Sequence, residues 1–434
     1  MRTAIAALTI LLVSVPAAAD VAGRWLLEFD QHGTPAYYAF ELAQHGAQVT
    51  GDFDGDPLTG TFADGKLSFL GKDAVGGTDQ LDATVDGDTM KGTMTLVFGN
   101  NPQHPLSTPV TATRIAGRPA KPQRRAFVPT QFYREFSAKT APVMHVGLGD
   151  TIVTSTVDAG GVDAKGVERS LGGNPQTGPF YVDGAVPGDT LVVKIVKLRL
   201  NRDTAVSDDG IVPRALDADL AVQAKDLGTR VTWKLDRKRN VATTDHPGSH
   251  LGAYTVPLRP MLGCIATAVS TSSAAPPTGD SGSFGGNMDF NEITEGATVY
   301  LPVSTPGALL YVGDGHAAQG DGETTGDALE TSLDVEVTVD VIPKHRLPGP
   351  RVESPTHIIA LGYAGSLDEA LKAASSNMAH WLADTYGLTP SEIAQIYGTA
   401  AEYRVSEIAD RNAGIALKLS KDRLRVLVPS AAHR

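Results

Sequence analysis

Alternation of apolar and polar positions dominates the first quarter of the chain. Between residues 20 and 114, short alternating runs are separated by turn sequences such as Ala63-Asp64-Gly65 and Asp86-Gly87-Asp88. A period of two is typical of half-buried strands, and closely spaced turns favour antiparallel neighbours. We therefore predict a small antiparallel β-domain over residues 20–115, either a meander or a small barrel. Its predicted strands include Gly23–Phe29, Tyr37–Leu42, Lys66–Leu70, Leu81–Val85 and Thr93–Phe98.

The pattern changes beyond residue 126, where long Gly/Pro-rich loops separate the apolar runs. Strands are predicted over Thr151–Thr156, Thr190–Val196, Val299–Val303 and Val335–Val341. A helical period replaces the alternation further on. The predicted fold class is mainly β with α+β character, in which the small N-terminal antiparallel β-domain precedes a β-rich domain over residues 127–434 with C-terminal helices.

Two helices are marked by their start signals. Ser366 and Glu369 have the spacing of a capping box, and the helix that follows should end at Gly387. Thr389 and Glu392 repeat the spacing, with proline at the first helical position, where its missing N–H costs nothing. The first helix is predicted to bury one apolar stripe, formed by Leu367, Leu371, Ala374, Met378, Trp381 and Leu382.

The first residues have the pattern of a secretory signal peptide. Arg2 precedes the apolar run Ala4–Val15, and Ala17-Ala18-Ala19 supplies the small residues of a cleavage site. We expect residues 1–19 to be removed before Asp20, and the mature chain to be exported to the periplasm or outside the cell. The apolar run is shorter than the ~20 residues that a spanning helix needs, so no membrane span is expected.

Charge and composition narrow the choice of partners. The 434 residues carry a formal net charge of −12, which disfavours nucleic acid and anionic membrane surfaces. We expect a small-molecule substrate and a homo-dimer or higher homo-oligomer. The basic cluster Arg118–Arg125 is Pro-rich, so residues 116–126 are predicted to be an extended linker, beyond which the second domain folds and acts independently.

The segment Gly313–Glu323, GDGHAAQGDGE, concentrates ionisable side chains directly after the apolar run Ala308–Val312. Glycines allow positive φ angles, so side chains that are close in sequence can converge on one point. Asp and Gly alone are equally typical of an acidic, water-facing turn. A plain turn requires neither His316 nor Gln319, and the segment is therefore predicted to belong to a functional site.

Several long motifs support a family resemblance. They are Asn174-Pro175, Thr177-Gly178-Pro179, Val182–Ile195, Phe284–Asp289 and Leu301–Glu323. In order and character they resemble the acetamidase/formamidase family, from about residue 127 to the C-terminus. The resemblance implies hydrolysis of a short-chain linear amide, formamide- or acetamide-like, to a carboxylate and ammonia on a β-rich fold. The alternative is an exported non-catalytic ligand-binding or surface-interaction protein on an amidase-like scaffold.

Amide hydrolysis requires an activated nucleophile, a stabilised oxyanion and a proton for the leaving nitrogen. Cys264, the one cysteine, lies in a small-apolar segment without a charged sequence neighbour, which favours a buried, inert thiol. Ser272-Ser273 lacks the glycine-rich setting and lysine of a Ser-Ser-Lys enzyme. Water, activated by a metal or by a base, is the favoured nucleophile.

Metal-activated water requires about three protein ligands and one open position. The predicted ligands Asp158, Asp289 and His316 suit zinc, with calcium or magnesium as alternatives if oxygens dominate, and no organic cofactor is expected. Glu323 or Asp321 would then be the general base, whereas without a metal His316 would form the base with a neighbouring aspartate. The residues assigned to substrate and oxyanion binding are Gly285, Gly286, Asn287, Asp314 and Gln319.

Overall fold

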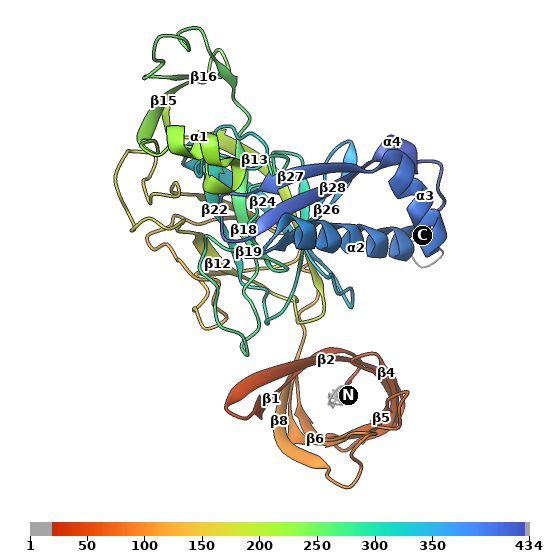
Figure 1. Ribbon diagram of the computed structural model, residues 1–434. Helices are drawn as coiled ribbons and strands as arrows, with labels where there is room; N and C mark the ends of the chain where they lie inside the picture. The colour runs from red at the N-terminus through yellow and green to blue at the C-terminus, as the bar shows by residue number, and fades with distance from the viewer. Residues whose placement is uncertain (1–19, 430–434) are drawn as a thin grey trace, which may run out of the picture. The chain divides into compact units, whose positions relative to one another are not determined.

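The computed structural model describes residues 20–429, so the predicted signal peptide lies outside the described residues. Contacts divide the described chain into two compact units (Figure 1). The barrel unit comprises residues 20–30 and 38–114, and the body comprises residues 31–37 and 115–429. Within the described residues, no helix combines the length and the apolar character that crossing a membrane requires.

The barrel unit is a closed barrel of eight antiparallel strands, each paired with the next along the chain. Strand β8 returns to β1, with Trp25 opposite Arg114 and Phe29 opposite Val110. The predicted antiparallel domain is therefore confirmed in its barrel form. Its strands are β1 (Gly23–Gln31), β2 (Thr34–His45), β3 (Gln48–Phe53), β4 (Asp56–Ala63), β5 (Lys66–Lys72), β6 (Thr78–Asp86), β7 (Thr89–Val97) and β8 (Leu106–Arg114).

Inward positions of the barrel hold the apolar half of the alternation. The rings of Phe40, Phe53 and Phe69 pack with centroids 5.6 to 6.1 Å apart. The guanidinium of Arg114 lies 4.3 Å from the ring centroid of the fully buried Trp25. An eight-stranded barrel is just wide enough for side chains to fill, and these side chains form its packed core.

The body contains two sheets that share one hydrophobic core. Leu191 and Val337 contribute to this core from a nine-stranded sheet, and Ile265 and Val312 from an eleven-stranded sheet. The nine-stranded sheet has the order β27-β28-β26-β25-β21-β13-β24-β11-β9. Its strands are β9 (Arg124–Ala126), β11 (Thr151–Ser155), β13 (Thr190–Leu200), β21 (Thr298–Pro302), β24 (Leu333–Ile342), β25 (Arg351–Glu353), β26 (His357–Ala364), β27 (Glu402–Glu407) and β28 (Ala413–Ser420).

The eleven-stranded sheet has the order β17-β16-β15-β14-β23-β22-β18-β20-β19, and β12 joins it by pairing with both β22 and β10. Its strands are β10 (Met144–Val146), β12 (Thr177–Val182), β14 (Thr204–Asp208), β15 (Arg230–Asp236), β16 (Val241–Thr244), β17 (Val256–Pro257), β18 (Met261–Ala266), β19 (Ser281–Gly282), β20 (Gly285–Asn287), β22 (Leu310–His316) and β23 (Glu330–Thr331). The β-rich fold class predicted for the body is confirmed.

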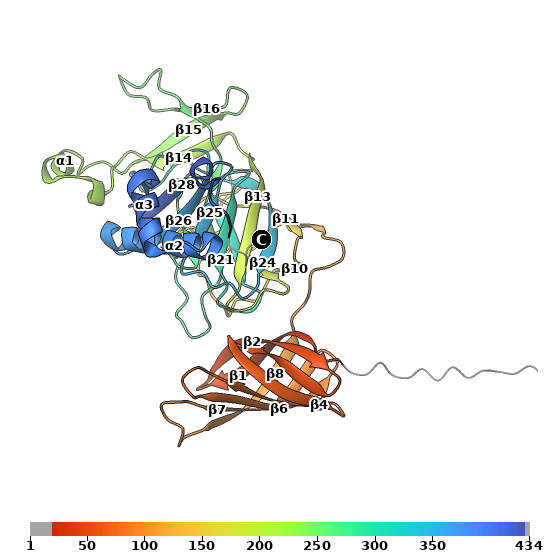
Figure 2. The same cartoon turned by 90° about the vertical axis from the view of Figure 1, so that its right-hand side faces the viewer.

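The predicted C-terminal helices are α2 (Leu367–Tyr386) and α3 (Pro390–Ala400), and Figure 2 shows α2 lying along the nine-stranded sheet at β26. Thr389 and Glu392 form both halves of a capping box, whereas at α2 the Ser366 side chain caps Glu369 N. The shorter helices are η1 (Pro213–Ala215), α1 (Ala218–Gln223) and α4 (Lys421–Leu424).

The buried face of α2 differs from the predicted stripe. Ala374, Met378 and Leu382 of the stripe are fully buried as predicted, but Leu367 and Leu371 are 38% and 42% exposed, and Ala370 is buried in their place. The reason is Gly362 on β26, where an added Cβ would collide with the backbone of the helix. Such a close approach selects the small residues of α2 for the contact.

The predicted linker reaches into the body. Its last residues, Arg124–Ala126, form β9 and pair in parallel with β11. Arg125 Nε lies 2.5 Å from Oδ2 of the buried Asp150, and Arg124 pairs with Glu336 at 2.9 Å. A chain that begins at residue 125 would lose part of β9, so independent folding of the body, which stays a prediction, requires a start before residue 124.

Candidate active site

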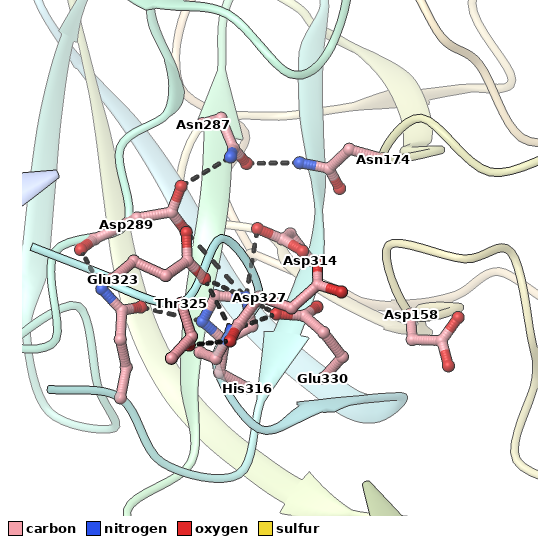
Figure 3. A network of polar contacts seen from close by, with 12 residues as sticks. Asp158, Asn174, Asn287, Asp289, Asp314, His316, Glu323, Thr325, Asp327 and Glu330 are labelled. Carbon is pink, nitrogen blue, oxygen red and sulfur yellow. Dashed lines mark hydrogen bonds and ion pairs between the residues drawn. The ribbon is translucent and has the colours of Figure 1, made fainter. Parts of the chain in front are cut away.

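Strand β22 lies at the centre of the candidate site and carries Asp314 and His316. All of its residues are buried, and it lies between β18 and β23 in the sheet. The register places His316 opposite Met261 on one side and Glu330 on the other. Figure 3 shows acidic side chains gathering around His316 from this strand and from neighbouring segments.

Four carboxylates surround the Nε2 atom of His316. The nearest oxygens lie 2.9 Å away for Glu330, 3.3 Å for Asp314, 3.8 Å for Glu323 and 3.9 Å for Asp289. None of these side chains is more than 6% exposed. Ligand atoms lie within 4.8 Å of one another in two sets, Asp289–His316–Glu323 and Asp314–His316–Glu330.

Hydrogen bonds define the state of the His316 ring. Gln319 Nε2 donates to the backbone oxygen of Asp289 at 2.5 Å, which leaves Gln319 Oε1 to accept from Nδ1 of His316 at 2.8 Å. Nδ1 therefore carries a hydrogen, and Nε2 is the atom at which a second proton or a metal ion binds. Within residues 20–429, neither Nε2 of His316 nor Oδ1 of Asp289 makes a hydrogen bond. A cation between the side chains would give both of these buried atoms a partner.

The backbone around this cluster adopts unfavourable conformations. Asp289, Asp314 and Glu323 have φ angles of 41°, 57° and 46°, in a region that disfavours residues with a Cβ atom. Gly263 on β18 makes room for two of the side chains, because an added Cβ would collide with the carboxylates of Asp289 and Asp314. Such strain persists where the surrounding structure imposes it, and it is concentrated at functional sites.

Burial raises the pKa of most of these acids. It is the main cause for Asp289 and Glu323, whose pKa values lie well above the ordinary range, and neighbouring carboxylates add to the shift. Burial also raises the pKa of Glu330 to about 8, although His316 opposes it. Burial disfavours the imidazolium, yet Glu330 and Asp314 raise the pKa of His316 well above its usual value. For Asp314, burial is outweighed by His316, and its pKa is lowered.

Sequence reasoning does not identify Glu330, Glu407 or Asp410. Glu330 begins β23, three residues before the alternating run Leu333–Ile342, and a charge at that position is the signal that could have found it. Glu407 ends β27, and its charge adds to the raised pKa of Glu323. Burial raises the pKa of Glu407 to about 8 and that of Asp410 to about 6. No local pattern distinguishes these two acids from surface residues.

One guanidinium holds the segment that carries Glu407 and Asp410. Arg214, in η1, donates to the backbone oxygens of Ile408 and Asp410 at 3.0 Å and of Arg411 at 3.3 Å. Within the same turn, Oε1 of Glu407 accepts the N–H of Asp410 at 2.8 Å. A segment distant in sequence is thereby fixed beside the central strand.

Two predicted site residues lie outside the cluster. Oδ2 of Asp158 lies 2.6 Å from Arg202, its Oδ1 accepts the N–H of Val162, and Figure 3 shows it apart from the other acids. Asp321 is partly exposed and binds Arg404 through both oxygens. Both carboxylates already have cationic partners. The structure therefore does not support Asp158 as a metal ligand or Asp321 as the general base.

The residues assigned to the oxyanion have other partners. Asn287 donates to Oδ2 of Asp289 at 2.5 Å and to Oδ2 of Asp410 at 2.9 Å, which uses both hydrogens of its amide. Gly285 and Gly286 lie in β20, which pairs with β18 on one side and β19 on the other. Asn287 thus acts on Asp289, and the oxyanion role assigned to these three residues has no geometric support.

Cys264 is fully buried on β18. Burial, followed by the nearby Asp314 and Asp289, raises the pKa of its thiol well above the ordinary value. Because the thiolate is the nucleophilic form, this environment makes the side chain unreactive. The structure therefore gives no support to a thiol nucleophile, and the water nucleophile stays a prediction.

Comparisons with known sequences cover the segments that form this site. Residues 273–419 match the model of the Acetamidase/Formamidase family. A formamidase of Methylophilus methylotrophus is 26% identical over 296 residues, which cover 54% of this chain and 72% of that protein. A shorter match, 54% identical over 39 residues, spans 9% of this chain and 10% of a predicted formamidase of Schizosaccharomyces pombe.

Solved structures share the fold of much of the chain. A predicted acetamidase/formamidase of Thermoanaerobacter tengcongensis superposes with a TM-score of 0.60 at 27% identity, covering 72% of this chain and 99% of that protein. An acetamidase of Bacillus halodurans gives a TM-score of 0.59 at 28% identity, covering 70% and 99%. The family match contains His316 and all the acids of its cluster.

Proposed function

Because the chain belongs to the acetamidase/formamidase family of linear-amide hydrolases, we propose that it cleaves a short-chain amide, formamide- or acetamide-like, to a carboxylate and ammonia. One observation carries the assignment of this reaction to the buried cluster. Nε2 of His316 lies within 3.9 Å of four carboxylates and, within residues 20–429, makes no hydrogen bond. The near-complete burial of these side chains favours a small substrate.

The residues present fit a divalent metal ion. Each set of three, Asp289–His316–Glu323 or Asp314–His316–Glu330, offers one nitrogen and two oxygens within 4.8 Å. Three such ligands with an open position are typical of catalytic zinc, whereas calcium and magnesium prefer oxygen ligands alone. When bound, the ion would supply Lewis acidity and lower the pKa of water in the site.

Glu323 and Glu407 are the side chains that would hold and move protons. The two carboxyl groups influence each other's pKa, and burial raises the pKa of both. A carboxyl group whose pKa lies near the working pH can take a proton from the attacking water and return it to the leaving nitrogen. Glu323 lies 3.8 Å from Nε2 of His316, beside the ion that the other candidate ligands would hold, so we assign it the role of general base.

Metal analysis combined with ammonia release tests this proposal. We expect purified protein to contain zinc and to release ammonia from formamide and acetamide with a higher kcat/KM than from longer or aromatic amides. Protein that contains zinc but hydrolyses no linear amide would contradict the function and favour a non-catalytic binding protein. Full turnover after complete removal of metal by a chelator would contradict the metal but leave the function standing.

Export of the chain is a separate proposal that rests on the sequence pattern of residues 1–19. Intact-mass measurement of protein recovered outside the cytoplasm should show a chain that begins at or near Asp20. A mass that includes residues 1–19 would contradict it. The expected homo-oligomer also stays a prediction, which sedimentation analysis of the purified protein would test.

A further inference from the structure

A chain of carboxamide side chains ends on the carboxylate of Asp289. Gln176 Nε2 donates to Oδ1 of Asn174 at 2.9 Å, and Asn174 Nδ2 donates to Oδ1 of Asn287. Asn287 then donates to Oδ2 of Asp289 at 2.5 Å, and Figure 3 shows the last two of these bonds. The four side chains are at most 7% exposed, so water does not compete with this chain of bonds.

Every bond in this chain runs in the same direction, and both ends fix that direction. A carboxylate accepts hydrogen bonds, so Asn287 turns its NH₂ group to Asp289 and its Oδ1 to Asn174. At the other end, Gln176 also donates to the backbone oxygen of Asn174 at 3.0 Å, a group that can only accept. Rotating any one amide would place two donors or two acceptors face to face. The polarity of the chain therefore favours a charged Asp289.

This arrangement has a structural cost at its far end. Within residues 20–429, Oε1 of the fully buried Gln176 makes no hydrogen bond. Gly313 on β22 leaves the space for the carboxamide, because an added Cβ would collide with it. A buried acceptor without a partner destabilises a fold and calls for an explanation. The explanation is that this orientation of Gln176 keeps every hydrogen bond of the chain directed toward Asp289.

We propose that Asn174 and Gln176 are positioning residues that act through Asn287. They hold Asp289 with Oδ2 occupied and with Oδ1, which is unpartnered among the described residues, directed at the cation site 3.9 Å from Nε2 of His316. The inference rests on the proposed metal site. Hydrogen bonds to a ligating carboxylate orient it and increase metal affinity, and successive hydrogen bonds polarise one another.

Zinc affinity, measured on the full chain by competition with a chelator, tests the inference. Asn174→Asp keeps the size of the side chain but removes its donor, and we expect zinc to bind roughly 10- to 100-fold more weakly. Gln176→Met acts one hydrogen bond further from Asp289 and should weaken zinc binding by roughly 3- to 10-fold. With amide substrate, both variants should lower kcat more than they raise KM, because neither residue is placed at the substrate.

Asn377→Ala is the matched control. Asn377 is 1% exposed and bonds Arg351 and the backbone of Pro350, outside the site. Its removal should lower the melting temperature while zinc affinity stays within about twofold of the wild type. Unchanged zinc affinity in Asn174→Asp, or a larger loss in Gln176→Met than in Asn174→Asp, would overturn the inference.

A double-mutant cycle keeps the test decisive if the aspartate variant does not fold. Once Asn287→Ser has broken the chain, Asn174→Ser should change zinc affinity by less than about twofold, and additive losses would overturn the inference. A wild type that binds zinc but hydrolyses no amide would contradict the proposed function alone. If the wild type hydrolyses amides without zinc, the same cycle is measured in kcat, where additivity again overturns the positioning role.

Discussion

The body holds two groups of acids, one around the buried Glu292 and one around His316, that differ in how their charge is balanced. In the first, Glu292 accepts from Arg404 at 2.6 Å and contacts Lys418 Nζ, while Asp321 binds the same guanidinium. In the second, four carboxylates face the single imidazole of His316. The first group is a closed ion-pair network, whereas in the second the carboxyl groups outnumber the one cationic side chain.

The difference shows that burial of acids does not by itself identify a site. Asp321 and Glu323 are two residues apart in one glycine-rich segment, yet Asp321 belongs to the balanced group and Glu323 to the unbalanced one. What distinguishes them is exposure, 43% for Asp321 against 6% for Glu323, together with the number of cations within reach. The balanced group should contribute to stability, and the unbalanced group should carry the chemistry.

Replacing His316 should have the largest effect on the unbalanced group. His316→Ala removes the one nitrogen ligand and leaves four buried acids without a cationic neighbour, so we expect loss of bound zinc and a fall in kcat/KM of roughly 10³-fold or more. Cys264→Ala, which deletes an unreactive thiol, should retain most activity. Loss of activity in Cys264→Ala with normal activity in His316→Ala would replace the water mechanism by a thiol mechanism.

Glu323→Gln and Asp321→Asn separate the two groups within one segment. Glu323→Gln keeps the size of the side chain but removes its basicity, so kcat should fall roughly 10²- to 10⁴-fold while zinc remains bound. Asp321→Asn loses a partly exposed ion pair and should change kcat by less than about threefold. Steady-state kinetics with metal analysis measures both. Equal losses in the two variants would show that the assignment of the base is wrong.

Lys418→Met should affect the balanced group alone. Lys418 is 7% exposed, and its removal leaves Glu292 with one cation fewer, which should destabilise the fold by about 3 kcal/mol in denaturant unfolding. Zinc content and kcat should stay close to those of the wild type. Loss of zinc in this variant would mean that the two groups behave as one electrostatic unit.

The pH dependence of stability should distinguish metal-free from zinc-loaded protein. The pKa values of Glu330 and Glu407 are raised from 4.5 to about 8 in the fold, and that of His316 is also raised. Groups that bind protons more tightly when folded stabilise the protein fully below their unfolded pKa and lose this effect as the pH rises through the folded pKa. The metal-free melting temperature should therefore fall from about pH 5 to about pH 8.

Bound zinc replaces these protons, so the loaded protein should show a flatter pH profile. Thermal unfolding with chelator and with zinc, over the same pH range, measures the contrast. A melting temperature of the chelated protein that rises with pH would contradict the direction of the shifts.

The parts of the fold that the sequence predicts are those decided by near neighbours. Alternation and glycine turns locate the barrel strands, and Thr389 with Glu392 marks the start of α3. Closure of β8 on β1 and the exposure of Leu371 depend on contacts between distant segments. Gly362 brings β26 close to α2, and no local sequence pattern identifies it as the contact residue.

The residues of the site also fall into two sets, those that neighbouring residues in the sequence reveal and those that only distant segments bring together. Asp314, His316 and Glu323 are found from the sequence because one strand and the loop after it carry all three. Glu407 reaches the site through the pairing of a distant strand, which no local spacing shows. Conversely, Asp158 has the sequence setting of a ligand, but Arg202, 44 residues away, neutralises it in the fold.

Glu407 lies late in the chain, 77 residues after Glu330, the last of the four acids around His316. A ribosome produces residues 289 to 330, with His316 and its four acids, well before it produces Glu407 and the turn that Arg214 holds. A nascent chain at that stage lacks one carboxyl group of the proton-transferring pair. A chain that ends before β27 should therefore lack one member of the proposed proton-transferring pair, even when β22 has its place in the sheet.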